Sequence, residues 1–269
     1  MQLFDSHAHI QGPEFAEDLE EVMMRAREAG VGQIVVPADD LEMARAAIAL
    51  AERDEGLFAT AGVHPHSAST MSRETLDEIE ALLRHEKVVA LGEIGLDYYR
   101  MHSSLPDQLK AFEAQLALAE KADVPVVIHC RDAWPDMGAI LSTWARKQSR
   151  QGPLGVMHYF TSSMADARLF VDLGFLISVH TIVTHPRSTE LREVVAGLPL
   201  EYLVLETDSP YGAPQVYRGR RNEPSYVLEA AKRVAELQGV DVERVAEVTT
   251  ENARRLFRLP AGVATDRAE

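Results

Sequence analysis

Histidines and carboxylates recur in this sequence directly after short apolar runs, where their side chains could hold a metal ion. His7 and His9 flank Ala8 near the N-terminus. In an extended segment, side chains two residues apart point to the same side, so both imidazoles can reach one divalent cation. A hydrogen-bonded pair of polar residues is the simpler alternative. The position at the end of an apolar run favours the metal site.

Two further histidines, His129 and His158, follow the apolar runs PVVI and GVM. A single histidine in such a place is more often a buried core residue than a metal ligand. The two become persuasive together, because adjacent strands of a sheet lie only about 4.8 Å apart. Both rings could then reach a second cation.

Two carboxylates are placed in the same way, Glu93 after VVAL and Asp208 after YLVL. A buried carboxylate without a partner is costly, so each needs a metal or a hydrogen-bond donor, and a salt bridge is the alternative. Glu93 is predicted to bridge two cations. Some two-metal sites use a carboxylated lysine instead, but Lys87 lies roughly 20 Å further down the strand at about 3.3 Å per residue.

These residues need a scaffold that gathers the ends of many strands, and the sequence predicts one. Short apolar, β-prone runs alternate with helical stretches, and strands of this kind are buried on both faces of a parallel sheet. We therefore predict an α/β fold, a (β/α)8 TIM barrel, as a single domain over residues 1–259, followed by a C-terminal tail over 260–269. In this fold the carboxyl ends of the strands form the active-site face. The eight runs lie at 3–4, 33–38, 57–65, 88–97, 125–130, 155–160, 175–179 and 202–208.

Helices are predicted between and after these strands. Residues 14–29 carry apolar side chains at helical spacing and end before Gly30, a candidate C-cap. The other predicted helices span 105–122, 132–146, 223–237 and 241–257.

Composition excludes several classes of protein. No apolar run approaches the roughly 18 residues of a membrane span, and MQLFDSHAHI does not read as a signal peptide. Cys130 is the only cysteine, which rules out an intrachain disulfide and favours a cytoplasmic location. The net charge of −15 argues against gripping long nucleic acid over a broad basic surface. A phosphate-bearing end entering a metal-containing pocket stays open. We expect no membrane association and no obligate protein partner.

The densest basic run in this acidic chain is YRGRRNEPSY, at 217–226. Arg218 and Arg221 are the candidate substrate contacts there, because guanidinium groups bind phosphate. A solvated loop is the alternative. Tyr98 and Tyr99 could stack on a base, although packing at the rim of the barrel is the simpler role.

Together these segments resemble the TatD-type deoxyribonuclease family of metal-dependent hydrolases. The similarity runs from Phe4 to about Phe257 and is carried by FDSHAHI, GVHPH, GEIGLDYY, PVVIH, the histidine at 158, LETDSPY, RGRRNEP and TENARRLF. It implies a metal-dependent barrel with two divalent ions, Mg, Mn or Zn. The ligands of one ion would be His7, His9, Glu93 and Asp208, and those of the other Glu93, His129 and His158. Two segments depart from the family pattern, YFTSS after the histidine at 158 and SVHTIVTHP after the seventh run, where a lysine is missing.

The predicted reaction is hydrolysis of a phosphodiester by a metal-activated water. The resemblance implies a deoxyribonuclease acting on DNA ends or single-stranded DNA, with 3′-to-5′ exonuclease digestion expected. Glu93, Asp208 and His64 are the predicted catalytic residues. Asp208 would orient the water or accept its proton, and His64, which matches a family histidine, would contact the phosphate or protonate the leaving oxygen.

Two alternatives remain open. A small-molecule amidohydrolase or lactonase could use the same two-metal barrel, because one barrel hosts many chemistries. A non-catalytic binding protein is the other alternative, and the complete set of ligand-type residues argues against it.

Overall fold

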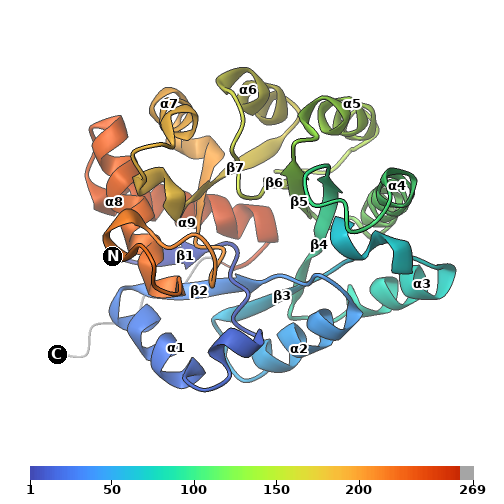
Figure 1. Cartoon of the computed structure of the whole chain (residues 1–269), viewed down its shortest axis with the longest axis horizontal. Coiled ribbons are helices and arrows are strands. Elements are labelled where there is room, and N and C mark those ends of the chain that lie inside the picture. The colour runs from blue at the N-terminus through green and yellow to red at the C-terminus, as the bar shows by residue number, and fades with distance from the viewer. Residues whose placement is uncertain (261–269) are drawn as a thin grey trace.

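Eight short strands lie side by side in the computed structural model, which describes residues 1–260. Their order in the sheet follows the chain from β1 to β8, and each neighbouring pair is parallel. Figure 1 shows the strands curling into a barrel with helices around the outside. The predicted fold class is confirmed. The strands are β1 (Leu3–Asp5), β2 (Val31–Val36), β3 (Leu57–Ala61), β4 (Val88–Asp97), β5 (Val126–Arg131), β6 (Gly155–Met157), β7 (Phe175–His180) and β8 (Leu203–Glu206).

The barrel closes where the first and last strands meet. The backbone N–H of Ser6 donates to the carbonyl of Leu205 at 2.9 Å. Just beyond the two strands, Ala8 and Ser209 form an isolated parallel bridge. The segments that carry His7 and Asp208 therefore lie beside each other, as the closed barrel predicts.

Helices follow the strands and cover the outer surface of the barrel. They are α1 (Leu19–Glu28), α2 (Leu41–Ala51), α3 (Arg73–Leu82), α4 (Leu105–Ala122), α5 (Trp134–Ala145), α6 (Met164–Asp172), α7 (Thr189–Gly197), α8 (Val227–Gln238) and α9 (Val242–Phe257). The predicted helix at 105–122 has these bounds. None of the helices within residues 1–260 is long and apolar enough to cross a membrane.

The expectation of one continuous helix over 14–29 is wrong at its start. A 3-10 turn spans Pro13–Phe15, and α1 begins only at Leu19. The guanidinium of Arg221 lies 4.4 Å from the ring centre of Phe15 and donates two hydrogen bonds to the carboxylate of Asp18, at 2.8 and 2.6 Å. These contacts come from the far end of the chain, so helical periodicity could not reveal the break.

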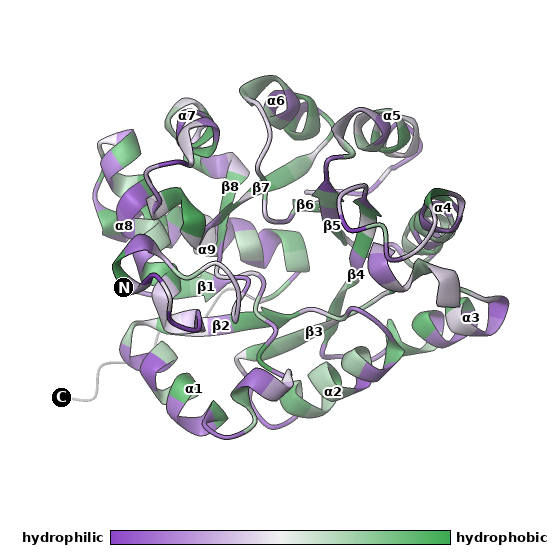
Figure 2. Cartoon of the chain, viewed as in Figure 1, coloured by the Kyte–Doolittle hydropathy of each residue, from purple (hydrophilic) through white to green (hydrophobic). Residues whose placement is uncertain are grey.

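Apolar side chains fill both layers of the structure. Inside the barrel, residues such as Val35, Val127 and Val204 form one buried cluster with Leu256 and Phe257 of α9. The ring of Phe257 stacks on that of Phe4, with ring centres 6.0 Å apart, so α9 plugs the amino end of the barrel. A larger cluster lies between the strands and the outer helices. Figure 2 shows hydrophobic strands and helices whose polar residues face outward. Most of the buried histidines and carboxylates lie at the carboxyl end.

The predicted tail over 260–269 lies, apart from Pro260, outside the described residues.

Candidate metal centre

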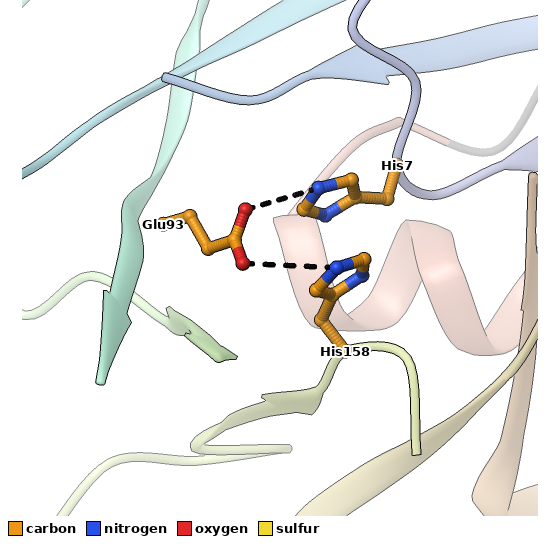
Figure 3. Close-up of side chains that lie close together, drawn as sticks. All are labelled: His7, Glu93 and His158. Carbon is orange, nitrogen blue, oxygen red and sulfur yellow. Dashed lines mark ion pairs between the residues drawn. The ribbon is translucent and has the colours of Figure 1, made fainter. Parts of the chain in front are cut away.

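Glu93 of β4 lies at the centre of a cluster of histidines at the carboxyl end of the barrel. Its Oε1 is 2.8 Å from Nδ1 of His129 and 3.7 Å from Nε2 of His158. Its Oε2 is 3.2 Å from Nε2 of His7 and 4.0 Å from Nε2 of His9. Figure 3 shows His7 and His158 both facing this carboxylate. One buried carboxylate thus touches both groups of predicted ligands.

The loops after β1 and β8 bring the first predicted group together. The backbone N–H of Asp208 donates to the carbonyl of His7 at 2.8 Å. The Oδ1 atom of Asp208 lies 3.4 Å from Nε2 of His9 and 3.7 Å from Nε2 of His7. The two Nε2 atoms are 3.2 Å apart. One ligand atom from each of the three residues lies within 4.8 Å of the others, close enough to share a metal ion.

A carboxylate holds the far ring nitrogen of each histidine predicted for the second ion. Nε2 of His129 is 3.2 Å from Oδ2 of Asp97, and Nδ1 of His158 is 2.9 Å from Oε2 of Glu206. The other nitrogen of each ring then faces Glu93. Carboxylate–histidine pairs of this kind orient the imidazoles that bind metals and raise their basicity. Asp97 and Glu206 were not among the predicted site residues, although both stand at strand ends.

The second predicted group is less compact than the first. The possible ligand atoms of His129, Glu93 and His64 lie within 4.8 Å of one another, close enough to bind one metal ion. The same holds for His158, Glu93 and His7. The rings of His7 and His158 stack at 3.5 Å between centres. His158 therefore lies between the two groups, and the assignment of each histidine to one of two ions stays a prediction.

The charges in this cluster depend on one another. Burial opposes ionisation of Glu93, but the neighbouring imidazoles of His158, His64 and His7 hold the pKa of its carboxyl well below the usual value. Burial also opposes ionisation of Asp208, yet the hydrogen bond with His9 and the nearby imidazoles lower its pKa to about 2. Both carboxylates are therefore anions at neutral pH.

Histidines provide the only ionic partners of Glu93 and Asp208 within residues 1–260, and no lysine or arginine pairs with either. Burial opposes protonation of His9 and His158, yet the neighbouring carboxylates raise their pKa to about 9 and about 10, so imidazolium ions can balance the two anions. Bound divalent cations would take the place of these protons, because a metal is held by neutral imidazole. Imidazole nitrogens and carboxylate oxygens are ligands that Zn and Mn accept. The residues present fit bound divalent metal.

His64 is oriented differently from the other histidines. It directly precedes Pro65, and its Nδ1 accepts a hydrogen bond from the backbone N–H of His66 at 3.1 Å. A neutral ring with Nδ1 as acceptor carries its proton on Nε2. That Nε2 lies 3.5 Å from Oε1 of Glu93 and borders the cavity described next. The ring is thus a hydrogen-bond donor toward the site, which suits contact with substrate better than metal binding.

A cavity of about 540 Å³ opens above these side chains. Glu93, Asp208, His64 and His129 lie in its wall, together with His158 and His9. Arg100, Arg131 and Tyr211 also border it, and none of these three was predicted as a site residue. Their position at a strand end or a few residues after one was the available hint in the sequence.

The basic segment at 217–226, which carries Arg218 and Arg221, does not border this cavity. Arg218 is exposed and borders none of it, and Arg221 pairs with Asp18 beside α1. Their predicted roles as substrate contacts stay predictions. Any nucleic acid that met Arg218 would extend beyond the cavity mouth.

The two segments that depart from the family pattern pack against each other. The rings of Tyr159 and His180 lie 4.1 Å apart between centres. Gly212 completes the packing, because a Cβ there would come within 2.3 Å of Cε1 of His180 and the backbone has φ of 62°. The His180 side chain is fully buried at the end of β7, so ring packing fills the space between β7 and the loop after β6.

Asn222, within the RGRRNEP segment, fastens the loop that carries Asp208. Its Nδ2 donates to the carbonyls of Thr207 and Tyr211 at 2.7 and 2.6 Å, and its Oδ1 accepts from the backbone N–H of Glu223 at 3.0 Å. The side chain is fully buried. The sequence pattern alone did not identify this role.

Asn222→Ala should lower the free energy of unfolding by about 1–3 kcal/mol, because buried carbonyls lose their donor. It should also lower metal content, because the loop that holds Asp208 loosens. Urea unfolding and metal analysis measure the two effects. Asn252→Ala is the matched control, since its Nδ2 donates to the carbonyls of Leu200 and Leu203, both at 2.8 Å, at the other end of the barrel. An equal loss of metal in both variants would contradict the positioning role.

Comparisons with known proteins agree with this geometry. A family described as "TatD related DNase" matches residues 4–258. An uncharacterized metal-dependent hydrolase, YabD, from Bacillus subtilis is 40% identical over 257 residues, which cover 96% of this chain and 99% of that protein. The 3′-5′ ssDNA/RNA exonuclease TatD of Pectobacterium parmentieri is 35% identical over 263 residues, covering 96% and 100%.

Solved structures show the same similarity. The crystal structure of YJJV, a TatD homolog from Escherichia coli K12, is 34% identical, has a TM-score of 0.89, and covers 96% of this chain and 98% of that one. An organophosphorus hydrolase variant from Deinococcus radiodurans, at 15% identity, a TM-score of 0.64 and coverage of 95% and 92%, shares the fold alone. The chain belongs to the TatD-related DNase family of metal-dependent hydrolases.

Proposed function

We propose that this protein removes nucleotides from single-stranded DNA ends in the 3′-to-5′ direction, using two divalent metal ions. The observation that carries the proposal is the position of Glu93, whose two carboxylate oxygens face separate groups of imidazoles at the floor of an open cavity. The exonuclease names of relatives at 35% and 37% identity support the substrate class.

The metal ligands in this proposal are those predicted from the sequence. His7, His9 and Asp208 would hold one ion, His129 and His158 the other, and Glu93 both. When bound, the ions would activate water and neutralise charge on the phosphate. Mg, Mn and Zn are the candidate metals.

The chain's own groups would position the reacting atoms. Asp208, an anion at neutral pH, accepts a hydrogen bond from the attacking water and can take up its proton. His64 presents Nε2–H to the cavity and donates to a phosphate oxygen or to the leaving oxygen. Glu93 itself is buried, with 2% of its surface exposed.

Two further parts of the proposal concern the cellular location and the basic segment at 217–226. The buried Cys130 as single cysteine suits a reducing compartment, so we place the protein in the cytoplasm. Arg218 would contact the nucleic acid outside the cavity, and Arg221 would hold the loop through Asp18.

Digestion of end-labelled single-stranded DNA in Mg or Mn tests the function. A ladder that shortens from the 3′ end supports it. A lactone panel and single-stranded RNA are assayed in parallel. Rapid turnover of a lactone with intact DNA would replace the proposal by the small-molecule alternative.

Removing metal with a chelator should abolish hydrolysis while the fold persists. The ligands decorate one end of a barrel whose apolar core is separate from them. Far-ultraviolet circular dichroism should stay unchanged, and adding Mg or Mn back should restore activity. Unfolding by the chelator would instead make the metals structural and contradict the proposal.

A further inference from the structure

Arg100 and Arg131 are the only lysine or arginine residues among the residues that line the active-site cavity of the described chain. Both stand at strand ends. Arg131 is the last residue of β5, and Arg100 follows β4 by three residues. Arg131 is two residues after His129 in one strand, so the two side chains point to the same side of the sheet. The strand that supplies a predicted metal ligand therefore also supplies a cation at the cavity wall.

The aromatic ring of Tyr99 positions both guanidinium groups. The guanidinium carbon of Arg131 lies 3.9 Å from the ring centre, and that of Arg100 lies 5.8 Å from it. A guanidinium held against an aromatic face keeps its N–H groups available at its edge. Neither arginine has a carboxylate partner within residues 1–260, whereas Arg221 is bound by Asp18.

Asp97 links the segment that carries Arg100 to a predicted metal ligand. Its Oδ1 accepts hydrogen bonds from the backbone N–H groups of Tyr99 and Arg100, at 2.9 and 2.6 Å. Its Oδ2 faces Nε2 of His129 at 3.2 Å and Nε2 of His66 at 2.8 Å. The segment that carries Arg100 is thereby attached to the same carboxylate that orients a predicted metal ligand.

Four carboxylates elsewhere in the cavity wall repel a polyanion. Asp39, Glu93, Asp97 and Asp208 all border the cavity, in a chain of net charge −15. Metal ions can neutralise the phosphate that reacts, but the next phosphate of a strand needs a cation of its own. A paired guanidinium edge is the geometry that matches phosphate oxygens.

We propose that Arg100 and Arg131, held by Tyr99, bind the phosphate next to the one that is hydrolysed. This inference rests on the proposed phosphodiester hydrolysis and extends it. It implies that the enzyme prefers oligonucleotides with at least two consecutive phosphodiesters to substrates with a single phosphodiester.

Two substrates separate this contact from the chemistry. One is a single-stranded oligonucleotide of about a dozen nucleotides, and the other is bis(4-nitrophenyl) phosphate, which has only one phosphorus. Arg131→Ala should lower kcat/KM on the oligonucleotide by about ten- to a hundredfold. On the small diester the change should stay within about threefold. Arg131→Lys should recover only part of the loss, because an ammonium cannot form the two-pronged contact.

Arg53→Ala is the matched control. Arg53 is an exposed arginine just before β3, at the amino end of the barrel, and its removal changes the net charge equally. It should affect neither substrate. Metal content and circular dichroism verify that each variant is folded and loaded.

Binding gives a readout that does not depend on hydrolysis. A fluorescent oligonucleotide with phosphorothioate linkages is titrated with wild type and Arg131→Ala, and the salt dependence of binding should become shallower by about one phosphate contact in the variant. If the wild-type protein binds this probe but does not cut DNA, the proposed function is refuted. The effect of Arg131→Ala on binding of the probe would then still test the arginine contact. Unchanged binding and unchanged kcat/KM on the oligonucleotide in Arg131→Ala and Arg100→Ala would overturn the inference.

Discussion

Glu93→Gln is expected to lower kcat/KM on DNA by more than about a hundredfold and to strip much of the bound metal. Loss of a group that only supports a metal ligand already costs about ten- to a hundredfold, and Glu93 faces the ligands directly. Its two oxygens lie 2.8 Å from His129 and 3.2 Å from His7. Glutamine has one neutral oxygen and one N–H₂ group, so it can accept on one side only.

Metal analysis and DNA digestion of the purified variant measure both losses. Glu206→Gln is the matched control, because Glu206 is equally buried but acts through His158. It accepts from Nδ1 of His158 at 2.9 Å and from the backbone N–H of Tyr159 at 2.7 Å. We expect a loss of only about ten- to a hundredfold there. Normal metal content and activity in Glu93→Gln would remove Glu93 from the metal centre.

Asp208→Asn is expected to lower kcat by about 10²–10⁴-fold, the usual contribution of a group that handles a proton. The asparagine keeps an oxygen 3.4 Å from Nε2 of His9 and tolerates the left-handed backbone at this position, where φ is 52°. Metal content should therefore fall less than in Glu93→Gln. The anionic carboxylate, whose pKa is about 2, is what the variant loses.

Turnover at increasing metal concentration distinguishes the two possible roles of Asp208. Activity that stays low at saturating metal supports proton handling. Full recovery would make Asp208 a metal ligand only. Asp123→Asn is the control, because Asp123 has the same φ of 52° and ends α4 at the opposite end of the barrel, so both metal content and turnover should remain normal.

The amino-acid sequence determined the fold and predicted much of the candidate metal centre, because both follow local patterns. Runs of Val, Ile and Leu separated by helical stretches predicted a parallel barrel, and the barrel brings all strand ends to one face. His7, Glu93, His129 and Asp208 could be predicted because each follows such a run. Their meeting in one cluster at the carboxyl end of the barrel is a consequence of that topology.

Tertiary structure alone decided which groups support and surround that centre. Asp97 and Glu206 back histidines 32 and 48 residues away, so their roles depend on contacts between strands. Arg221 looked like a phosphate contact in a basic run, but it pairs with Asp18, 203 residues earlier.

Arg131 was not predicted, because a single arginine at the end of a strand does not show by itself which groups it meets. Its place in the cavity wall depends on Tyr99, which lies 3.9 Å from the guanidinium and comes from the neighbouring strand's loop. Periodicity and spacing report which face of an element is buried. The partner that a charged side chain meets is set by distances across the fold, and those distances appear only when the chain is folded.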